Sequence, residues 1–318
     1  MSSSVQAGTP PDTGARPPAA LVAVPVRHYG RWAGAAMVLA ALLYLLWRLT
    51  HLPQIDYQTI PRFLFKPPIL LGLQETIVLS LVAQSIGIVL GIALAVMRLS
   101  RNPVLSAVSW LYIWFFRGTP LIVQILFWFN GLLFLVRTVT IAIPFTGVQL
   151  YSAPARDVIT GFTAAILALS LNEGAYMAEI VRAGILAVDR GQTEAAAALG
   201  MTGGLTMRRI VLPQAMRVIL PPTGNEFISM LKNTALVVVI GGGELLSVST
   251  HIYSQSGKIF ELLVVASIWY LVLTSLASIG QYYLERRFSR GDARELVPTP
   301  LQRLRARVAR PASPGRSA

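Results

Sequence analysis

The sequence contains long apolar runs that no charged side chain interrupts. Residues 76–97 and 262–284 are uncharged over 22 and 23 positions, and residues 118–136 add 19 more. A helix rises about 1.5 Å per residue and the hydrocarbon layer of a bilayer is about 30 Å thick, so a span needs about 20 mostly apolar residues. These three segments therefore predict transmembrane helices.

Three further apolar segments fit the same pattern less cleanly. Residues 33–47 are short, but Trp32 and Trp47 frame them as an aromatic belt frames a membrane helix. Residues 158–181 and 227–246 are apolar helices with charges inside them. Those charges are Glu173 and Glu179 in one segment and Lys232 and Glu244 in the other. The pattern predicts an all-α polytopic membrane protein with about six transmembrane helices.

Composition supports this prediction and excludes other classes. Of the 318 residues, 54% are hydrophobic and 13% are charged, whereas an average globular protein is about one-quarter charged. The absence of cysteine excludes a disulfide framework, a thiolate metal site and a cysteine nucleophile. Because the three histidines are scattered along the chain, we expect no metal, no cofactor and no catalytic residue.

The net charge of +13 raises the question of where the cations lie. If residue 1 is cytoplasmic and six helices alternate, 20 Lys and Arg fall inside and six fall outside, as the excess of positive charge in cytoplasmic loops requires. Both termini are then cytoplasmic, in a cell inner membrane. The tail, residues 285–318, holds nine arginines without apolar periodicity, which predicts contact with membrane lipid headgroups and no nucleic-acid binding.

Four regions follow from these patterns. Residues 1–31 are rich in Ser, Pro, Gly and Ala and predict a disordered cytoplasmic segment. Residues 32–50 predict an additional N-terminal transmembrane helix, residues 70–284 a membrane core and residues 285–318 the basic cytoplasmic tail. Within the core, residues 137–157 are long for the external loop that they are expected to form.

A cytoplasmic stretch, residues 189–213, stands out between the fourth and fifth helices. Residues 192–199 are strong helix formers, and Gly200 follows where a left-handed residue would end the helix. Residues 205–212 are expected to be helical again until Pro213. The prediction is a short helix, a tight turn and a second short helix outside the membrane.

Seven residues of this stretch carry a specific resemblance. They are Glu194, Ala195, Ala196, Gly200, Ile210, Leu212 and Pro213. Their spacing resembles the EAA loop of ABC importer permeases, the membrane subunits that dock on a separate ATPase. The resemblance implies that the first helix seats in the ATPase, that Glu194 holds the loop's own hydrogen bonds, that Ala195 and Ala196 permit close packing, and that Gly200 makes the turn.

Other segments narrow the resemblance. Residues 115–121, 171–180 and 220–228 are similar to permeases for polar amino acids such as histidine, glutamine, arginine and opines, and the similarity runs through residues 70–284. It implies a five-helix importer core that takes up a polar amino acid. It also implies three partners: an ABC ATPase, a second permease copy or paralogue, and an extracytoplasmic amino acid binding protein. Because no phosphate-binding glycine loop is visible, the chain is not expected to be an enzyme, and ATP hydrolysis is expected in the ATPase.

Polar residues within the predicted helices are candidates for the substrate pathway, because a charge at mid-bilayer costs about 2.5 to 3.5 kcal/mol and such groups face protein or water. The candidates are Asn172, Glu173, Tyr176, Lys232 and Asn233. Glu173 could instead bond across a permease dimer or to a neighbouring helix, and Lys232 could extend to the membrane surface. Glu179 and Arg182, three residues apart, predict an ion pair, and residues 117–120 predict a bend with Pro120 in a first turn.

Three alternatives remain at this stage. The chain could be an ABC permease for another small solute, such as an opine or an amino acid derivative. It could be an ion-gradient-driven secondary transporter, although no symmetry between halves is visible and the loop at Glu194 would have no purpose. A membrane-embedded enzyme would need a cluster of acids or histidines that the sequence lacks. Homodimer and heterodimer are both open.

Overall fold

The computed structural model of the protein describes residues 29–52, 55–143, 146 and 149–288. These residues divide into two units, one ending at Gln54 and the other beginning at Ile55. The predictions for residues 1–28 and 289–318, which form most of the N-terminal segment and of the basic tail, lie outside the described residues.

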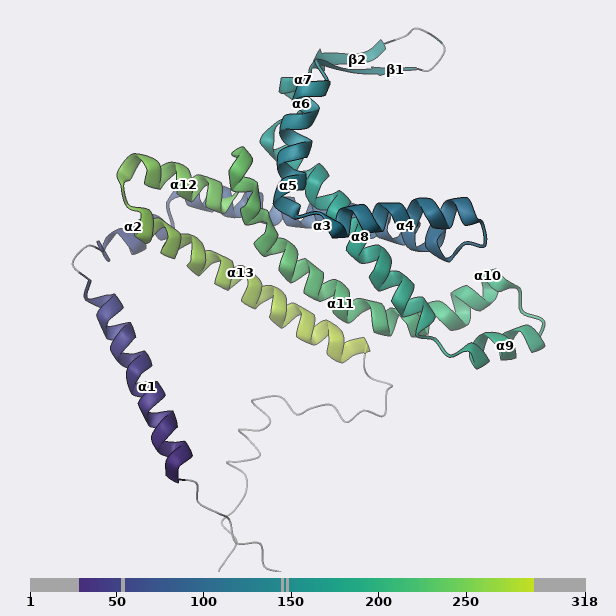
Figure 1. Ribbon diagram of the computed structural model, residues 1–318, viewed down its shortest axis with the longest axis horizontal. Coiled ribbons are helices and arrows are strands. Elements are labelled where there is room, and N and C mark those ends of the chain that lie inside the picture. The colour runs from purple at the N-terminus through teal and green to yellow at the C-terminus, as the bar shows by residue number, and fades with distance from the viewer. Residues whose placement is uncertain (1–28, 53–54, 144–145, 147–148, 289–318) are drawn as a thin grey trace, which may run out of the picture. The chain divides into compact units, whose positions relative to one another are not determined.

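The described chain is mostly helical (Figure 1). In chain order its elements are α1 (Tyr29–Thr50), α2 (Thr59–Leu64), α3 (Pro67–Leu99), α4 (Pro103–Gly118), α5 (Leu121–Leu126), η1 (Phe127–Gly131), α6 (Leu132–Leu135), β1 (Thr138–Ala142), β2 (Gln149–Pro154), α7 (Ala155–Val158), α8 (Gly161–Leu186), α9 (Arg190–Ala198), α10 (Gly203–Thr206), η2 (Met207–Val211), α11 (Leu212–Asn233), η3 (Thr234–Ile240), α12 (Leu245–Ser256) and α13 (Ile259–Phe288). The segments η1 and η2 are π-helical, and η3 is a 3₁₀-helix.

Three helices among the described residues, α3, α8 and α13, are long and apolar enough to cross a membrane. Two bent pairs raise the number to as many as five if each pair is one span: α4 with α5–α6, bent by 103°, and α10–η3 with α12, bent by 44°. In the N-terminal unit, the apolar stretch of α1 is Trp32–Leu45, shorter than the about 20 residues that a span needs. The fold class predicted from the sequence is confirmed, and the count of six exceeds what length and composition support.

The centre of the second unit is the packing of α3 on α8. Small buried residues recur every fourth position along one face of α3, at Ala83, Gly87, Gly91 and Ala95. A β-carbon on Gly87 would lie 2.5 Å from Cγ of Glu173, and one on Gly91 would lie 2.9 Å from the backbone nitrogen of Ala178. The two helices are therefore in contact along their backbones, which only residues with little or no side chain permit.

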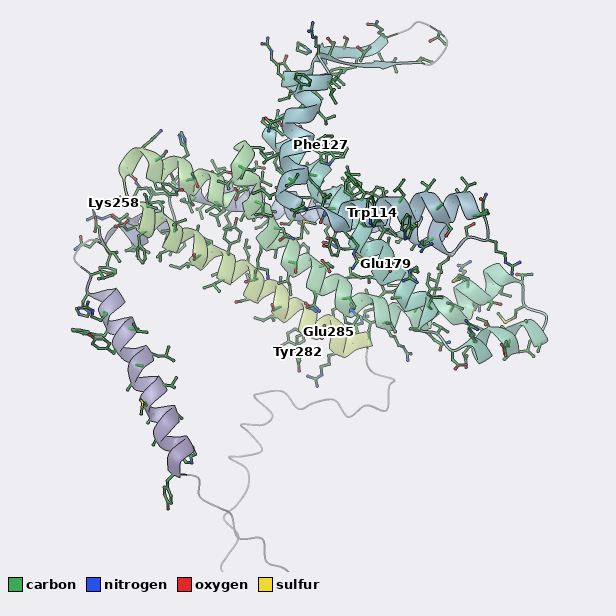
Figure 2. All side chains as sticks on the ribbon, viewed as in Figure 1. Trp114, Phe127, Glu179, Lys258, Tyr282 and Glu285 are labelled. Carbon is green, nitrogen blue, oxygen red and sulfur yellow. The ribbon has the colours of Figure 1, made fainter. Side chains whose placement is uncertain are left out.

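The helix α4 was missed by the sequence analysis, which predicted no helix between residues 97 and 118. Pro103 begins α4 in its first turn, where the missing N–H needs no partner, and the side chain of Asn102 accepts a hydrogen bond from the backbone N–H of Val104 at 2.9 Å. The predicted bend at residues 117–120 is confirmed, because α4 ends at Gly118 and Pro120 precedes α5. Beyond the bend, Phe127 lies in η1 (Figure 2).

The predicted fifth helix, residues 227–246, has the wrong bounds. The helical chain instead starts before it and runs from α10 through η2 and α11 to η3, then stops at Gly241, whose φ is +64°. The predicted bounds are wrong because the apolar run was taken as the whole helix, whereas the more polar residues before it, including the half-buried Glu226, continue the same helix. The second short helix likewise does not end at Pro213, since the wider π-helical turn of η2 just before it leaves room for the proline ring.

Glu244 lies outside that helix and begins α12. Its carboxylate is fully buried and accepts hydrogen bonds from the backbone N–H groups of Leu246 and Ser247, from the Ser247 hydroxyl, and from the Tyr270 hydroxyl at 3.1 Å. The first N–H groups of a helix have no partner within the helix, so a buried helix start needs such an acceptor. Glu244 is therefore a helix cap.

Residues 137–157, expected to form a long loop, contain a β-hairpin. Strands β1 and β2 pair antiparallel, with Thr138 opposite Pro154 and Ile141 opposite Tyr151. The backbone N–H of Ala155 donates to the carbonyl of Arg137 at 2.9 Å and closes the base of the hairpin. This two-stranded sheet is an addition to the predicted helical fold.

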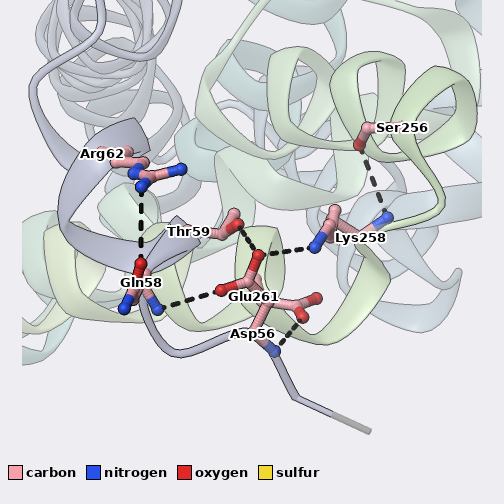
Figure 3. A network of polar contacts seen from close by, with 7 residues as sticks. All are labelled: Asp56, Gln58, Thr59, Arg62, Ser256, Lys258 and Glu261. Carbon is pink, nitrogen blue, oxygen red and sulfur yellow. Dashed lines mark hydrogen bonds and ion pairs between the residues drawn. The ribbon is translucent and has the colours of Figure 1, made fainter.

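A polar network joins the segment before α2 to the start of α13 (Figure 3). Asp56 accepts from Lys258 at 2.7 Å and from the Thr59 hydroxyl at 2.8 Å, and its backbone N–H donates to the buried Glu261 at 2.8 Å. The hydrogen bond and charge of Lys258 lower the pKa of Asp56 to about 2. Because that value lies below the ordinary range, the stabilisation from this pair is complete above about pH 4 and is lost only as the pH falls through about 2.

The close contact of α3 and α8 predicts opposite effects for one substitution at two helical glycines. Gly91→Ala should lower the free energy of unfolding by about 1–3 kcal/mol, because a methyl group there overlaps Met177. Gly280→Ala in α13 meets open space and should be neutral or stabilising by up to about 1 kcal/mol. Thermal unfolding of both variants in detergent measures the difference. Equal midpoints would contradict the contact.

Candidate functional site

The loop between α8 and α11 has the backbone geometry that its sequence predicts. Asp189 begins α9, and its side chain accepts a hydrogen bond from the N–H of Gly191 at 2.7 Å. At the other end, the N–H of Met201 donates to the carbonyl of Ala196 and the N–H of Gly200 to that of Ala197. This pair of bonds is the Schellman ending of a helix, and it requires the left-handed φ of +73° found at Gly200.

The residues of the loop differ in exposure. Ala196 is buried between α9 and the following helix of the same chain, whereas Glu194 and Ala195 are exposed. Glu194 makes no side-chain hydrogen bond with another described residue, so the bonds that hold the loop are those of the backbone around Gly200. Leu199, 82% exposed, lies at the turn.

The remaining residues of the resemblance lie past the turn. Ile210, in η2, is half-buried, and Leu212 and Pro213, in the first turn of α11, are exposed. The loop thus presents one exposed helix, α9, and an apolar tip at Leu199.

A polar cavity of about 530 Å³ lies where the α4–α5 bend, α8 and the α11–η3 helix meet. Its polar and charged lining residues are Arg117, Thr119, Asn172, Glu173, Tyr176, Glu226, Ser229 and Asn233. The volume is within the range of small-molecule sites, about 300–1,000 Å³. Two carboxylates and one guanidinium therefore face the same cavity.

Four of the five pathway residues predicted from the sequence line this cavity: Asn172, Glu173, Tyr176 and Asn233. Lys232 does not line it, and its side chain is exposed. The structure thus places Lys232 apart from the other four.

Asn172 has a structural bond as well. Its side-chain amide donates to the carbonyl of Phe116 at 3.0 Å and to Oε1 of Gln124 at 3.2 Å. Gln124 in turn donates to the carbonyls of Phe116 and Thr119. Because α4 ends here, these carbonyls have lost their helical partners, and the two amide side chains replace them.

Glu173 is 4% exposed and lies against Gly87 of α3. One carboxylate oxygen accepts a hydrogen bond from the amide of Gln84, also on α3, at 3.0 Å. Both roles that the sequence left open for Glu173 are therefore present together, since it bonds to a neighbouring helix and also lines the cavity.

A second cavity, of about 550 Å³, adjoins the first. Its lining includes Arg98, Trp110 and Trp114 together with Glu179, and it shares Arg117, Gly118 and Tyr176 with the first cavity. Trp114 of α4 and Glu179 of α8 are labelled in Figure 2. The predicted ion pair is confirmed, with Arg182 donating to Glu179 at 2.7 Å.

Three residues of these cavities were missed or given another role by the sequence analysis: Arg117, Glu226 and Ser229. Arg117 was interpreted only as part of a bend, and Glu226 only as part of residues 220–228, which resemble amino acid permeases. The available signal for Arg117 and Glu226 was that each lies just before a long apolar run. This signal does not show which face of the helix the charge occupies.

The chain belongs to the family of binding-protein-dependent transport system inner membrane components, which matches residues 87–290. It is thus the multi-pass, membrane-embedded permease component of an ABC transporter and not itself the ATPase. Membership of this family implies an ATPase and a binding protein as partners. The secondary transporter and the membrane-embedded enzyme are thereby excluded.

Several characterised relatives are similar over most of their length. The arginine transport system permease protein ArgU of Corynebacterium glutamicum is 46% identical, over 90% of this chain and 89% of ArgU. The arginine transport system permease protein ArtQ of Bacillus subtilis is 36% identical, over 74% of this chain and 97% of ArtQ. The alignment with ArgU covers more of this chain than residues 55–318 alone could supply. It therefore includes part of residues 1–54.

A solved structure described as an amino acid ABC transporter with histidines superposes with a TM-score of 0.63. It is 38% identical, and the alignment covers 74% of this chain and 99% of that one. The resemblance to polar amino acid permeases that the sequence suggested is confirmed.

The hydrogen bonds of the Asn172 and Gln124 side chains at the α4–α5 bend generate a stability prediction. Asn172→Ala and Gln124→Ala should each lower the free energy of unfolding by about 1–3 kcal/mol, because Gln124→Ala removes a donor to the Thr119 carbonyl and Asn172→Ala removes the donor to Oε1 of Gln124. The two effects should not add, since the two amides bond to each other and share the carbonyl of Phe116. Thermal unfolding of the three variants measures this coupling, and strict additivity would contradict it. Asn130→Ala, whose amide bonds only to its own helix, is the control.

Proposed function

We propose that this permease imports an amino acid with a cationic side chain, of the arginine class, through the cavity between the α4–α5 bend, α8 and α11. The observation that carries the proposal is the set of charges in the cavity. Such a substrate bears two cationic groups and one carboxylate, and the cavity offers Glu173, Glu226 and the guanidinium of Arg117. The two sets are complementary in number and sign.

The energetic argument favours a charged substrate over a neutral one. Carboxylates that face a cavity inside a membrane protein are costly unless a cation or water approaches them. Arg117 can balance only one of the two. A neutral amino acid such as glutamine brings a single ammonium group, whereas arginine brings an ammonium and a guanidinium that bonds a carboxylate with two parallel hydrogen bonds. The names of the relatives ArgU and ArtQ support this substrate class.

The loop of α9 and α10 is proposed as the docking site of the ATPase. The resemblance of this loop to the EAA loop supports the proposal, as do the exposed residues Glu194 and Ala195 on α9 and Leu199 at its tip. The Schellman turn at Gly200 makes the loop rigid. Docking there would transmit closure of the ATPase to α8 and α11 as a rigid-body movement.

The remaining expectations from the sequence are part of the same proposal. The loop of α9 and α10 lies on the cytoplasmic side of the membrane, and so do both termini. The chain pairs with a second permease subunit, either a copy or a paralogue. The helix α1 is an additional membrane helix outside the core of residues 70–284, and residues 285–318 are a basic cytoplasmic tail.

Substrate selectivity tests the proposed cavity. In proteoliposomes that contain the permease, its ATPase and its binding protein, wild-type protein should take up arginine in preference to glutamine. Glu226→Gln should raise the KM for arginine about tenfold, the equivalent of about 1.4 kcal/mol, because one charged hydrogen bond is lost. The KM for any residual glutamine uptake should change little.

The matched control is Glu285→Gln, at a carboxylate on α13 that bonds to Gln281 and lines neither cavity. It should behave as wild type. Equal uptake of arginine and glutamine by the wild type, or an unchanged KM in Glu226→Gln, would refute the cationic substrate.

The coupling loop is tested at two glycines. Gly200→Val should reduce both arginine uptake and the ATPase rate that the loaded binding protein stimulates by about tenfold or more, because a left-handed conformation costs a non-glycine residue about 1–2 kcal/mol and the turn would rearrange. Gly203→Val, at a helical position in open space, should stay within about twofold of wild type. Full coupling in Gly200→Val would show that the ATPase docks elsewhere.

A further inference from the structure

Arg117 and Tyr176 stand between the two polar cavities described above. Both residues line the first cavity, which holds Glu173 and Glu226, and both line the second, which holds Arg98 and Glu179. The guanidinium carbon of Arg117 is 5.2 Å from the centre of the Tyr176 ring. This pair, together with Gly118, forms the boundary that the two cavities share.

The second cavity lies nearer the coupling loop. Along α3 and α8, Gly87 meets Glu173 and Gly91 meets Met177, so the two helices run in the same direction. Arg98 is therefore at the same end as the C-terminal part of α8, which leads into α9. If the loop side is the side of release, the first cavity holds the substrate and the second is its exit.

The net charge of the lining residues differs in sign between the two cavities. The first contains two carboxylates and Arg117, whereas the second contains Arg98, Arg117 and Glu179, whose carboxylate is already paired with Arg182. The exit cavity is therefore cationic on balance. It repels the ammonium and guanidinium groups of an arginine-like substrate and attracts its carboxylate.

Arg117 is equipped to move between these environments. Its side chain makes no ion pair or hydrogen bond with the other residues that the structure describes, although it is attracted by Glu226 in the first cavity and by Glu179 in the second. Stacking on Tyr176 stabilises the guanidinium without fixing it to one carboxylate. An arginine with one permanent ion pair could not serve both sides.

We infer that Arg117 is the gate between the cavities, that it binds the α-carboxylate of the substrate, and that it passes this carboxylate on to Arg98 in the exit cavity. The inference rests on the proposed function, because it requires a cationic amino acid in the first cavity. Arg117 then recognises the part that every amino acid shares, and Glu173 and Glu226 recognise the cationic groups. Arg117 moves toward the exit cavity only when the carboxylate of the substrate moves with the Arg117 guanidinium.

The first test compares arginine with agmatine, which is arginine without its carboxylate. Both are measured by displacement of radiolabelled arginine from the purified permease–ATPase complex. Wild-type protein should bind arginine about tenfold more tightly than agmatine. In Arg117→Gln the affinity for arginine should fall to that for agmatine, while the affinity for agmatine stays unchanged. Arg117→Lys should lie between the two.

The second test separates binding from release in ATP-driven arginine uptake. Arg117→Gln should raise KM and lower kcat, because it loses both recognition and gating. Arg98→Gln should lower kcat several-fold with little change in KM, because Arg98 lines only the exit cavity. Arg101→Gln, at an exposed arginine that lines neither cavity, is the control and should match wild type.

The outcomes distinguish the gate from the proposed function. If Arg117→Gln weakens arginine and agmatine equally, Arg117 only supports the end of α4 and the inference is wrong. If arginine and agmatine already bind equally to the wild type, no carboxylate contact exists and the inference is also wrong. If the wild type binds glutamine as tightly as arginine, the cationic substrate class itself fails.

Discussion

Backbone contact between α3 and α8 is the constraint on which the rest of the structure depends. Lipid tails are as apolar as leucine, so membrane helices gain little by burying apolar side chains against each other and associate instead through close packing. The small residues Ala83, Gly87, Gly91 and Ala95 permit this packing. They bring Gln84 within hydrogen-bond distance of Glu173 and fix α8, from which the cavity residues project. A larger residue on this face would displace the site as well as the helix.

Broken helices create the cavities. Where α4 ends at Gly118, Asn172 and Gln124 bond its free carbonyls, and where η3 ends at Gly241, Glu244 caps the helix that follows. Within a membrane, unpaired backbone groups are tolerated only when protein or a water-filled cavity satisfies them. The polar side chains of this core thus fall into two sets. One set bonds the free backbone groups where helices end, and the other set faces the cavities. Asn172 belongs to both sets.

In the proposed function, the two cavities divide the recognition of a substrate by charge. Carboxylates dominate the cavity farther from the coupling loop, arginines dominate the nearer one, and Arg117 belongs to both. A cationic amino acid would be held by its cationic groups on one side and released through its carboxylate on the other. This arrangement ties selectivity to direction, because the same helix, α8, lines both cavities and leads into the loop proposed to meet the ATPase.

The sequence by itself determined the helical fold class, the transmembrane helices α3, α8 and α13, the left-handed turn at Gly200 and the Glu179–Arg182 pair, because each depends on composition or on contacts within about four residues. It also carried the resemblance to amino acid permeases. The start of α4 at Pro103 and the continuation through Pro213 are local features that the sequence analysis missed. Only the tertiary structure decided the contact of Glu244 with Tyr270 and the place of Arg117 and Glu226 in the cavities, since each depends on which helix face meets which neighbour. Such contacts join residues far apart in the chain, and the local pattern of polar and apolar residues does not contain them.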